Sequence, residues 1–189
     1  MSDWSNLIEL LKNARRSVLF RDGLSDAEVA RAERNYGFRF PDDLRTFLQT
    51  ALPWGFPFPD WRAEDDEGIR ESLGWPLHGI LFDVEQNEFW LPEWGSRPDR
   101  YEDANAIVAE HVGNAPKLIP IYSHRMMPER PLQPGNPVLS VYQTDIIYYG
   151  FDLDDYFRHE FDLPDRKPWP DEVRPIEFWD VRRWQDLQS

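Results

Sequence analysis

The residues best suited to chemistry lie in two short segments that border apolar runs. His124 and Arg125 directly follow one such run, and Gln143 and Asp145 lie in the three-residue break between two others. If these runs are neighbouring strands, an imidazole, a guanidinium and a carboxylate meet at one sheet edge, where they could bind a ligand or transfer protons. The alternative is an Arg125–Asp145 ion pair with His124 fixing the loop, and we favour it over catalysis.

The common signatures of catalysis, metal binding and nucleotide binding are absent from the sequence. It has no cysteine, which excludes disulfides and thiolate metal sites. Its ten glycines include no G-x-G pair, and neither a phosphate-binding loop nor a G-x-S-x-G nucleophile motif occurs. His159 and Glu160 begin like a zinc-protease motif, but Leu163 stands where the second histidine is required. We therefore predict no catalytic residue, no metal site and no cofactor.

A second cluster combines aromatic residues, prolines and an arginine. The segment 54–62 holds two tryptophans and two phenylalanines spaced by prolines, a pattern that no single helix face can accommodate. Trp54, Trp61 and Arg62 are of types that dominate the energetics of protein interfaces, so they are candidate anchors for a partner. The alternative is that this loop covers the sheet as a hydrophobic lid.

Acidic residues dominate the charge of the chain. Aspartate and glutamate number 35 against 21 lysines and arginines, which gives a net charge of −14. Such a field repels nucleic acid and anionic membranes, and it attracts basic proteins. Asp65, Asp66 and Glu67 form an acidic run and join the candidate partner-binding residues. The alternative is that the acidity only keeps an aromatic-rich chain soluble.

The sequence also bears on location. The N-terminus lacks the basic and apolar regions of a signal peptide, and no apolar run approaches the roughly 20 residues of a membrane helix. Together with the absence of cysteine, this predicts a cytoplasmic protein, and it leaves the oligomeric state open.

Hydrophobic periodicity predicts helices first and strands later. Ser25 and Glu28 form a capping box, Gly37 is a typical helix stop, and Asp152 can cap a later helix. We predict helices at 4–14, 25–36, 41–51, 101–112 and 152–161, a surface loop at 53–76, a strand hairpin from 77–84 and 88–91, and strands at 117–122, 138–142 and 146–149. This order indicates an α+β fold with a largely antiparallel sheet of about five strands packed with N-terminal helices and further helices.

The chain is expected to form one domain with a short extension. We place the domain at residues 1–163. Residues 164–189 are a proline-rich extension that ends in a helix carrying Ile176, Trp179, Trp184 and Leu187 and packs on the same domain.

One run resembles a known family signature. Residues 37–48, GFRFPDDLRTFL, are similar to the signature of the SUKH superfamily, which takes in bacterial immunity proteins and a fungal regulator of cell-wall assembly. Residues 59–62, 118–125 and 135–150 are similar to a bacterial branch, so the resemblance covers about residues 4–163. Residues 52–55, LPWG, depart from the Asn-Gly-Gly-type turn of many members. The resemblance implies a scaffold with a variable cleft that binds and neutralises toxin domains, with no shared catalytic residues.

The leading hypothesis is therefore a non-catalytic protein-binding domain that neutralises a toxin, with a basic toxin domain as the expected partner. The first alternative is a regulatory scaffold that binds a housekeeping protein, for instance in envelope assembly. The second is a small hydrolase that uses His124 and Asp145.

Overall fold

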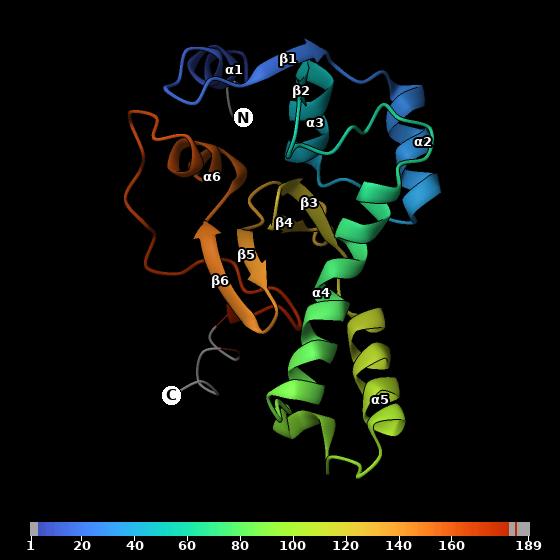
Figure 1. Ribbon diagram of the computed structural model, residues 1–189. Coiled ribbons are helices and arrows are strands. Elements are labelled where there is room, and N and C mark those ends of the chain that lie inside the picture. The colour runs from blue at the N-terminus through green and yellow to red at the C-terminus, as the bar shows by residue number, and fades with distance from the viewer. Residues whose placement is uncertain (1–3, 182–183, 185–189) are drawn as a thin grey trace.

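The first fifty residues form three helices at the predicted places. The computed structural model describes residues 4–181 and 184, and its first helices are α1 (Trp4–Lys12), α2 (Asp26–Tyr36) and α3 (Asp42–Thr50) (Figure 1). Both hydrogen bonds of the capping box between Ser25 and Glu28 are present. Gly37 ends α2 with φ of 67°, a left-handed conformation that glycine adopts without a Cβ penalty.

The strands form two antiparallel sheets. β1 (Leu19–Asp22) pairs with β2 (Ala51–Trp54), while β3 (Leu118–Tyr122), β4 (Arg125–Pro128), β5 (Val138–Tyr142) and β6 (Asp145–Gly150) form a four-stranded sheet in chain order. The expected α+β class is thus confirmed, and the prediction of about five strands in one sheet is corrected. Sequence analysis missed β1, β2 and β4, each only four residues long.

The predicted hairpin at 77–84 and 88–91 is wrong, because this part of the chain is helical. Helix α4 (Glu67–Gln86) runs through it, and Asp66 caps α4 by accepting a hydrogen bond from the Ile69 amide at 3.2 Å. The apolar residues at 77, 80, 81 and 84 follow helical spacing, but their density is equally typical of a buried strand. Pro76 also argued against a helix, yet α4 continues through it.

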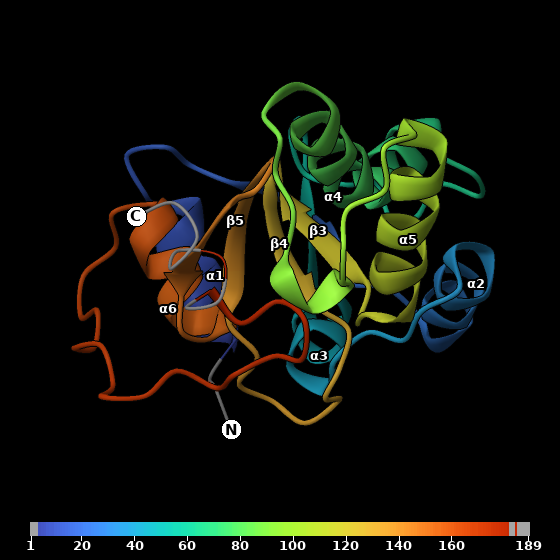
Figure 2. The same cartoon turned by 90° about the horizontal axis from the view of Figure 1, so that it is seen from below.

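Helices enclose the larger sheet on two sides. Figure 2 shows this sheet between α4 and α5 (Tyr101–Asn114) on one side and α6 (Leu153–Glu160) with α1 on the other. A short 3-10 helix, Pro92–Trp94, lies between α4 and α5. Asp152 caps α6 as predicted, by accepting a hydrogen bond from the Asp155 amide at 2.8 Å. No helix within residues 4–181 combines the length and hydropathy needed to span a bilayer.

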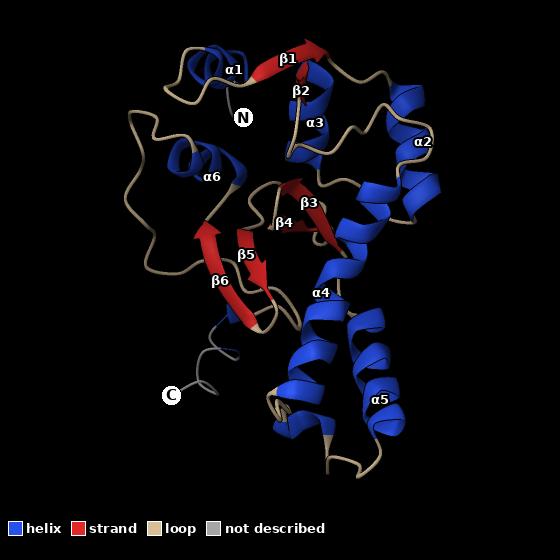
Figure 3. Cartoon of the chain, viewed as in Figure 1, coloured by secondary structure: helices blue, strands red, loops and turns tan. Residues whose placement is uncertain are grey.

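The long loop after α6 first extends outward, with residues 164–172 exposed, and then returns to the rest of the chain (Figure 3). Ile176, Trp179 and Trp184 are buried in one of two hydrophobic clusters, together with residues of α4, α5 and the larger sheet. The Trp179 indole donates a 2.7 Å hydrogen bond to the Pro116 carbonyl. Ile176 and Trp179 were predicted on a closing helix, but the chain at 176–180 is not helical, and of the described residues beyond it only positions 181 and 184 are. Leu187 lies outside the described residues, and the boundary at residue 163 stays a prediction.

Candidate functional site

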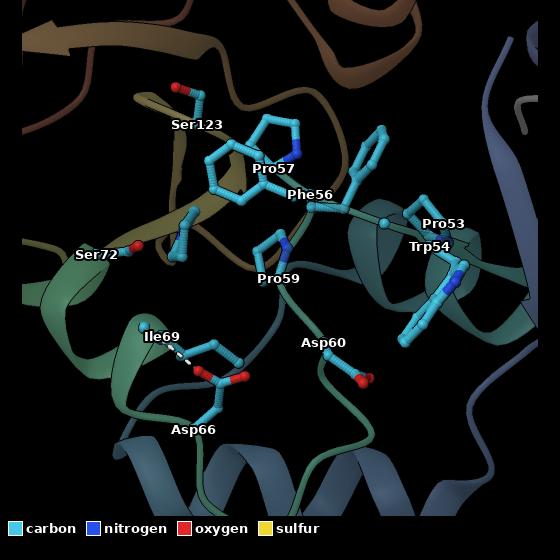
Figure 4. Close-up of a pocket in the computed structure, with 14 residues that line it drawn as sticks. Pro53, Trp54, Phe56, Pro57, Pro59, Asp60, Asp66, Ile69, Ser72 and Ser123 are labelled. Atoms are coloured by element: carbon cyan, nitrogen blue, oxygen red, sulfur yellow. Dashed lines mark hydrogen bonds between the residues drawn. The ribbon is translucent and has the colours of Figure 1, made fainter.

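An open groove of about 360 Å³ lies between the N-terminal part of α4, the loop that follows β2, and the turn between β3 and β4 (Figure 4). We call it the Phe56 groove. Its walls are mainly proline, aromatic and aliphatic side chains, with a few polar groups at its edge. They are Pro53, Trp54, Gly55, Phe56, Pro57, Phe58, Pro59, Asp60, Asp66, Gly68, Ile69, Ser72, Pro120 and Ser123.

The loop that carries Phe56 is held in place at several points. Its Phe58 amide donates to the Gly55 carbonyl at 2.9 Å, and the Ser123 amide donates to the Pro57 carbonyl at 3.2 Å. The Phe58 ring packs on Tyr122 and Phe161, with centroids 4.7 and 6.2 Å away. Phe56 has no such place in the core, and its side chain is fully exposed.

Two carboxylates line this groove and a third, Glu71, lies nearby on α4, and none of them has a cationic partner within the described residues. Asp60 accepts a hydrogen bond from the Arg62 amide, Asp66 caps α4, and Glu71 is exposed one turn farther along α4. None of the three forms an ion pair with any residue in the described part of the chain, whereas neighbouring Asp65 pairs with Arg70 at 2.8 Å. The groove therefore offers unneutralised negative charge beside an apolar wall.

Exposed aromatic residues continue from the groove along α4. A second cavity of about 230 Å³ shares Ser72 and Ser123 with the groove and is also lined by Trp75 and His124. The Trp75 indole donates to the Val141 carbonyl at 3.2 Å, and its ring lies 6.3 Å from that of Tyr142.

Helical spacing places Phe82 on the same side of α4 as Trp75, two turns later. Trp75, Tyr142 and Phe82 keep 45, 56 and 50% of their surfaces exposed, and Phe56 keeps all of its own. We call these four residues the aromatic face.

The predicted Arg125–Asp145 ion pair is wrong. Arg125 instead pairs with Glu160 of α6 at 3.3 Å, donates to the Ser140 hydroxyl at 2.7 Å, and stacks on the Tyr149 ring with its guanidinium carbon 3.6 Å from the centroid. Arg125 is the first residue of β4, and this strand points its side chain toward α6 rather than toward the 143–145 turn.

His124 and Asp145 lie apart. His124 precedes β4, and Asp145 is the first residue of β6. Because β5 lies between these two strands, they are two strand spacings, roughly 10 Å, apart. His124 lines the cavity beside Trp75, while Gln143 and Asp145 line a separate polar cavity of about 470 Å³ near Asp83. Burial and the adjacent Arg125 lower the pKa of His124, which favours the neutral imidazole. This geometry gives no support to an acid–base pair of His124 and Asp145.

The buried carboxylate of Asp83 fixes the turn that contains Gln143. It accepts hydrogen bonds from the amide and the hydroxyl of Thr144 at 2.9 and 2.6 Å, and it also accepts one from the Asn87 side chain at 2.6 Å. These bonds join the end of α4 to the β5–β6 turn. The conformation of the turn that contains Gln143 is therefore explained by these contacts within the fold.

Trp61 is not exposed as a partner anchor, contrary to the sequence hypothesis. Its surface is only 2% exposed, and its ring makes edge contacts with Tyr36, Phe38 and Phe40 at centroid distances of 5.2–5.9 Å. Trp61 is therefore a core residue beside α2 and residues 38–40, and it is not available as an interface anchor.

Arg62 also makes its contacts within the fold, and it is not left free for a partner. It pairs with Glu28 at 2.7 Å and donates to the carbonyls of Asp22 and Gly23 at 2.9 and 3.1 Å. The Ser25 amide and Arg62 lower the pKa of Glu28 to about 2. Arg62 thus ties the loop to the start of α2.

Of the other sequence candidates, Trp54 and Asp66 line the groove together. Trp54 is partly covered by Arg21, whose guanidinium stacks 3.0 Å from its ring centroid. Asp65 and Glu67 are exposed at the start of α4, beside the groove. None of the candidates belongs to a metal site, since residues 4–181 contain no cluster of three or more side chains suited to hold a metal ion.

The sequence hypothesis missed most of the aromatic face. Phe56 lay within the noted cluster, but nothing in its neighbours indicated that its side chain would be fully exposed. Trp75 and Phe82 were missed because the helix that displays them was assigned to a loop and a hairpin. The signal that could have found them is the spacing 71, 75, 78 and 82, which places all four residues on one side of a helix.

Comparison with known proteins adds a family. No curated protein and no solved structure gives a significant match. Residues 23–181 match the SMI1 / KNR4 family (SUKH-1), past the residue 163 at which the sequence resemblance stopped. Domains of this family are generally non-enzymatic immunity or regulatory domains that bind other proteins. The chain belongs to the SMI1 / KNR4 (SUKH-1) family.

Proposed function

We propose that this protein is a toxin-neutralising immunity protein, which binds a basic toxin domain with the Phe56 groove and the aromatic face. Family membership supports a role in protein binding, and the net charge of −14 favours a cationic partner. Neither of these observations locates the binding surface.

The exposure of the aromatic face carries the proposal. Isolated exposed apolar residues are ordinary, but a continuous group of them marks an interaction surface. Phe56 and Trp75 border cavities that share two residues, and Trp75 contacts Tyr142. Large aromatic side chains lose little conformational entropy when a partner covers them, so such residues dominate interface energies.

The rigidity of the surface also favours binding. The Phe56 loop is fixed by backbone hydrogen bonds and by the packing of Phe58, and Trp75 is oriented by its hydrogen bond to β5. A surface that is ordered before binding has less entropy to lose when the complex forms.

The test uses the product of the gene next to the gene of this protein, where that product contains a toxin domain. Expressed alone it should arrest growth, and co-expression of this protein should restore growth. Phe56→Ser and Trp75→Ser should each weaken the complex at least about tenfold, as expected for interface hot spots. The matched control is Tyr101→Ser on α5, which removes an aromatic side chain that is 54% exposed and lines neither the groove nor the adjoining cavity.

The outcomes separate the alternatives. Growth that is not restored by the unaltered protein would reject toxin neutralisation. If the neighbouring gene encodes no toxin and the aromatic face binds a housekeeping protein, the regulatory role replaces the toxin-neutralising role. Loss of binding in Tyr101→Ser but not in the other two variants would move the interface to α5.

A further inference from the structure

We propose that the Phe56 groove recognises a segment of the partner in which an arginine or lysine stands next to an apolar residue. The apolar side chain enters the groove, and the cationic group binds the carboxylates of Asp60 and Asp66. This inference rests on the proposed function and specifies the chemistry of its partner.

The walls of the groove determine what can enter it. Phe58, Ile69 and Pro120 present hydrophobic surface from three different elements. The volume of about 360 Å³ lies at the lower end of the range of ligand pockets, so the groove has room for one or two side chains. An apolar side chain that leaves water here gains the free energy of hydrophobic burial.

The edge of the groove determines the charge of the occupant. Asp60 and Asp66 lie on the same side of the groove, across from Ser123 (Figure 4). Each accepts one hydrogen bond from a backbone amide, which leaves its carboxylate with further acceptor capacity. No lysine or arginine lines this groove or the adjoining cavity, so an incoming cation meets no competitor of its own sign.

Nearby carboxylates differ in a way that supports this assignment. Glu28 and Asp65 are within the same region but are already paired with Arg62 and Arg70. Asp60 and Asp66, which line the groove, form no ion pair within the described residues. An arginine suits this place best, because its planar guanidinium can bind a carboxylate bidentately while its methylene chain lies along apolar surface.

An acidic or second-copy occupant is disfavoured by the same charges. A second copy would bring a further net charge of −14 against the groove. A partner with an acidic segment would meet Asp60, Asp66 and Glu71 with no cation to offset them. Charge complementarity therefore selects the cationic occupant.

The test is a titration of the full-length, isotopically labelled protein with short peptides. Binding is monitored by the NMR chemical shifts of the backbone amides. The probe is acetyl-Gly-Arg-Phe-Gly-amide, and the controls replace its arginine by glutamate or its phenylalanine by serine. The probe should shift the amides of Gly55, Gly68, Ile69 and Ser72 with a dissociation constant on the order of 1 mM. Each control peptide should bind at least about fivefold more weakly, and added salt should weaken only the arginine peptides.

Two conservative substitutions remove the charge while keeping the fold. Asp60→Asn keeps the oxygen that accepts from the Arg62 amide, and Asp66→Asn keeps a good N-cap for α4. The double variant should bind the probe at least fivefold more weakly at an unchanged melting temperature. The matched control, Glu102→Gln with Asp103→Asn in the first turn of α5, makes the same change in net charge and should bind as the unaltered protein does.

Equal binding of the arginine and glutamate peptides, or shifts confined to other regions, would overturn the inference. If the toxin domain still binds and Trp75→Ser still weakens that complex, the proposed function stands and only the assigned occupant is wrong. If the probe binds as described but no toxin domain does, the groove chemistry stands and the immunity role is wrong.

Discussion

Replacement of Arg125 by methionine separates a structural role from a partner-binding one. The guanidinium is held by Glu160 at 3.3 Å, by the Ser140 hydroxyl at 2.7 Å and by the Tyr149 ring at 3.6 Å. The side chains of Arg125 and Glu160 are only 14 and 8% exposed. Methionine fills a similar volume but leaves the carboxylate of Glu160 buried with one cation fewer.

The expected cost follows from these contacts. Breaking a buried ion pair by removing one partner destabilises a protein by about 3–5 kcal/mol, because the remaining charge is left uncompensated. Arg16 still pairs with Glu160 at 3.1 Å, which places the cost near the lower end, about 3 kcal/mol. Arg16→Met should cost less than about 1 kcal/mol, because the Arg16 side chain is 57% exposed and its pairing is screened by water.

Urea unfolding at pH 7 measures the change in the free energy of unfolding for Arg125→Met and for Arg16→Met. A double variant measures the interaction between Arg125 and Glu160. Arg125→Met combined with Glu160→Leu should recover part of the loss, giving a coupling free energy of at least about 1.5 kcal/mol. If Arg125→Met lowers the free energy of unfolding by less than about 1 kcal/mol but weakens the toxin complex tenfold, the structural placement is refuted. The sequence hypothesis of Arg125 as a partner-binding residue would then be restored.

Three further predictions concern stability. Phe47→Ala should cost about 3–5 kcal/mol in urea unfolding, because the ring is 1% exposed in the core, and unchanged unfolding would refute the placement of α3. Glu28→Gln should lower the free energy of unfolding by about 1 kcal/mol at pH 7. At this pH the Glu28 carboxylate is ionised, accepts a hydrogen bond from the Ser25 amide in the capping box, and pairs with Arg62. Since folding lowers the Glu28 pKa from 4.5 to about 2, this difference should shrink as the pH falls from 4.5 toward 2, and a difference that stays constant over that interval would contradict the assignment. Gly150→Ala should lower the melting temperature, because an added Cβ would lie 2.6 Å from atoms of α6, whereas Gly113→Ala in α5 meets open space and should not lower it; equal effects would contradict the packing of α6 on β6.

Elements whose signals are local were predictable from the sequence. The capping box at Ser25 and Glu28, the glycine stop at Gly37 and the Asp152 cap each depend on residues within one helical turn. These caps, together with hydrophobic periodicity, allowed five of the helices to be assigned. Strand β4 depends instead on pairing with β3 and β5, and its four residues carry too short a pattern to reveal it.

The candidate site was less predictable, because exposure depends on tertiary packing. Trp54 and Trp61 belong to one aromatic loop, yet the first lies at the groove and the second lies in the core between α2 and the loop. The difference arises from Phe38 and Phe40, which cover Trp61 and which no local rule connects to it. In the same way, Arg125 pairs with Glu160, which is 35 residues away in the sequence, rather than with Asp145, which is nearer in the sequence.

Helix α4 contributes to both the core and the aromatic face, because its opposite sides face different surroundings. Ile80 and Val84 are fully buried and belong to the cluster that includes the sheet and the C-terminal tryptophans. Trp75 and Phe82 stand on the exposed side of the same helix. Substitutions on the exposed side should therefore change binding without unfolding the helix, while those on the buried side change both. A loss of binding in Trp75→Ser at unchanged stability is evidence for a recognition surface, since a residue that only completes the fold cannot produce it.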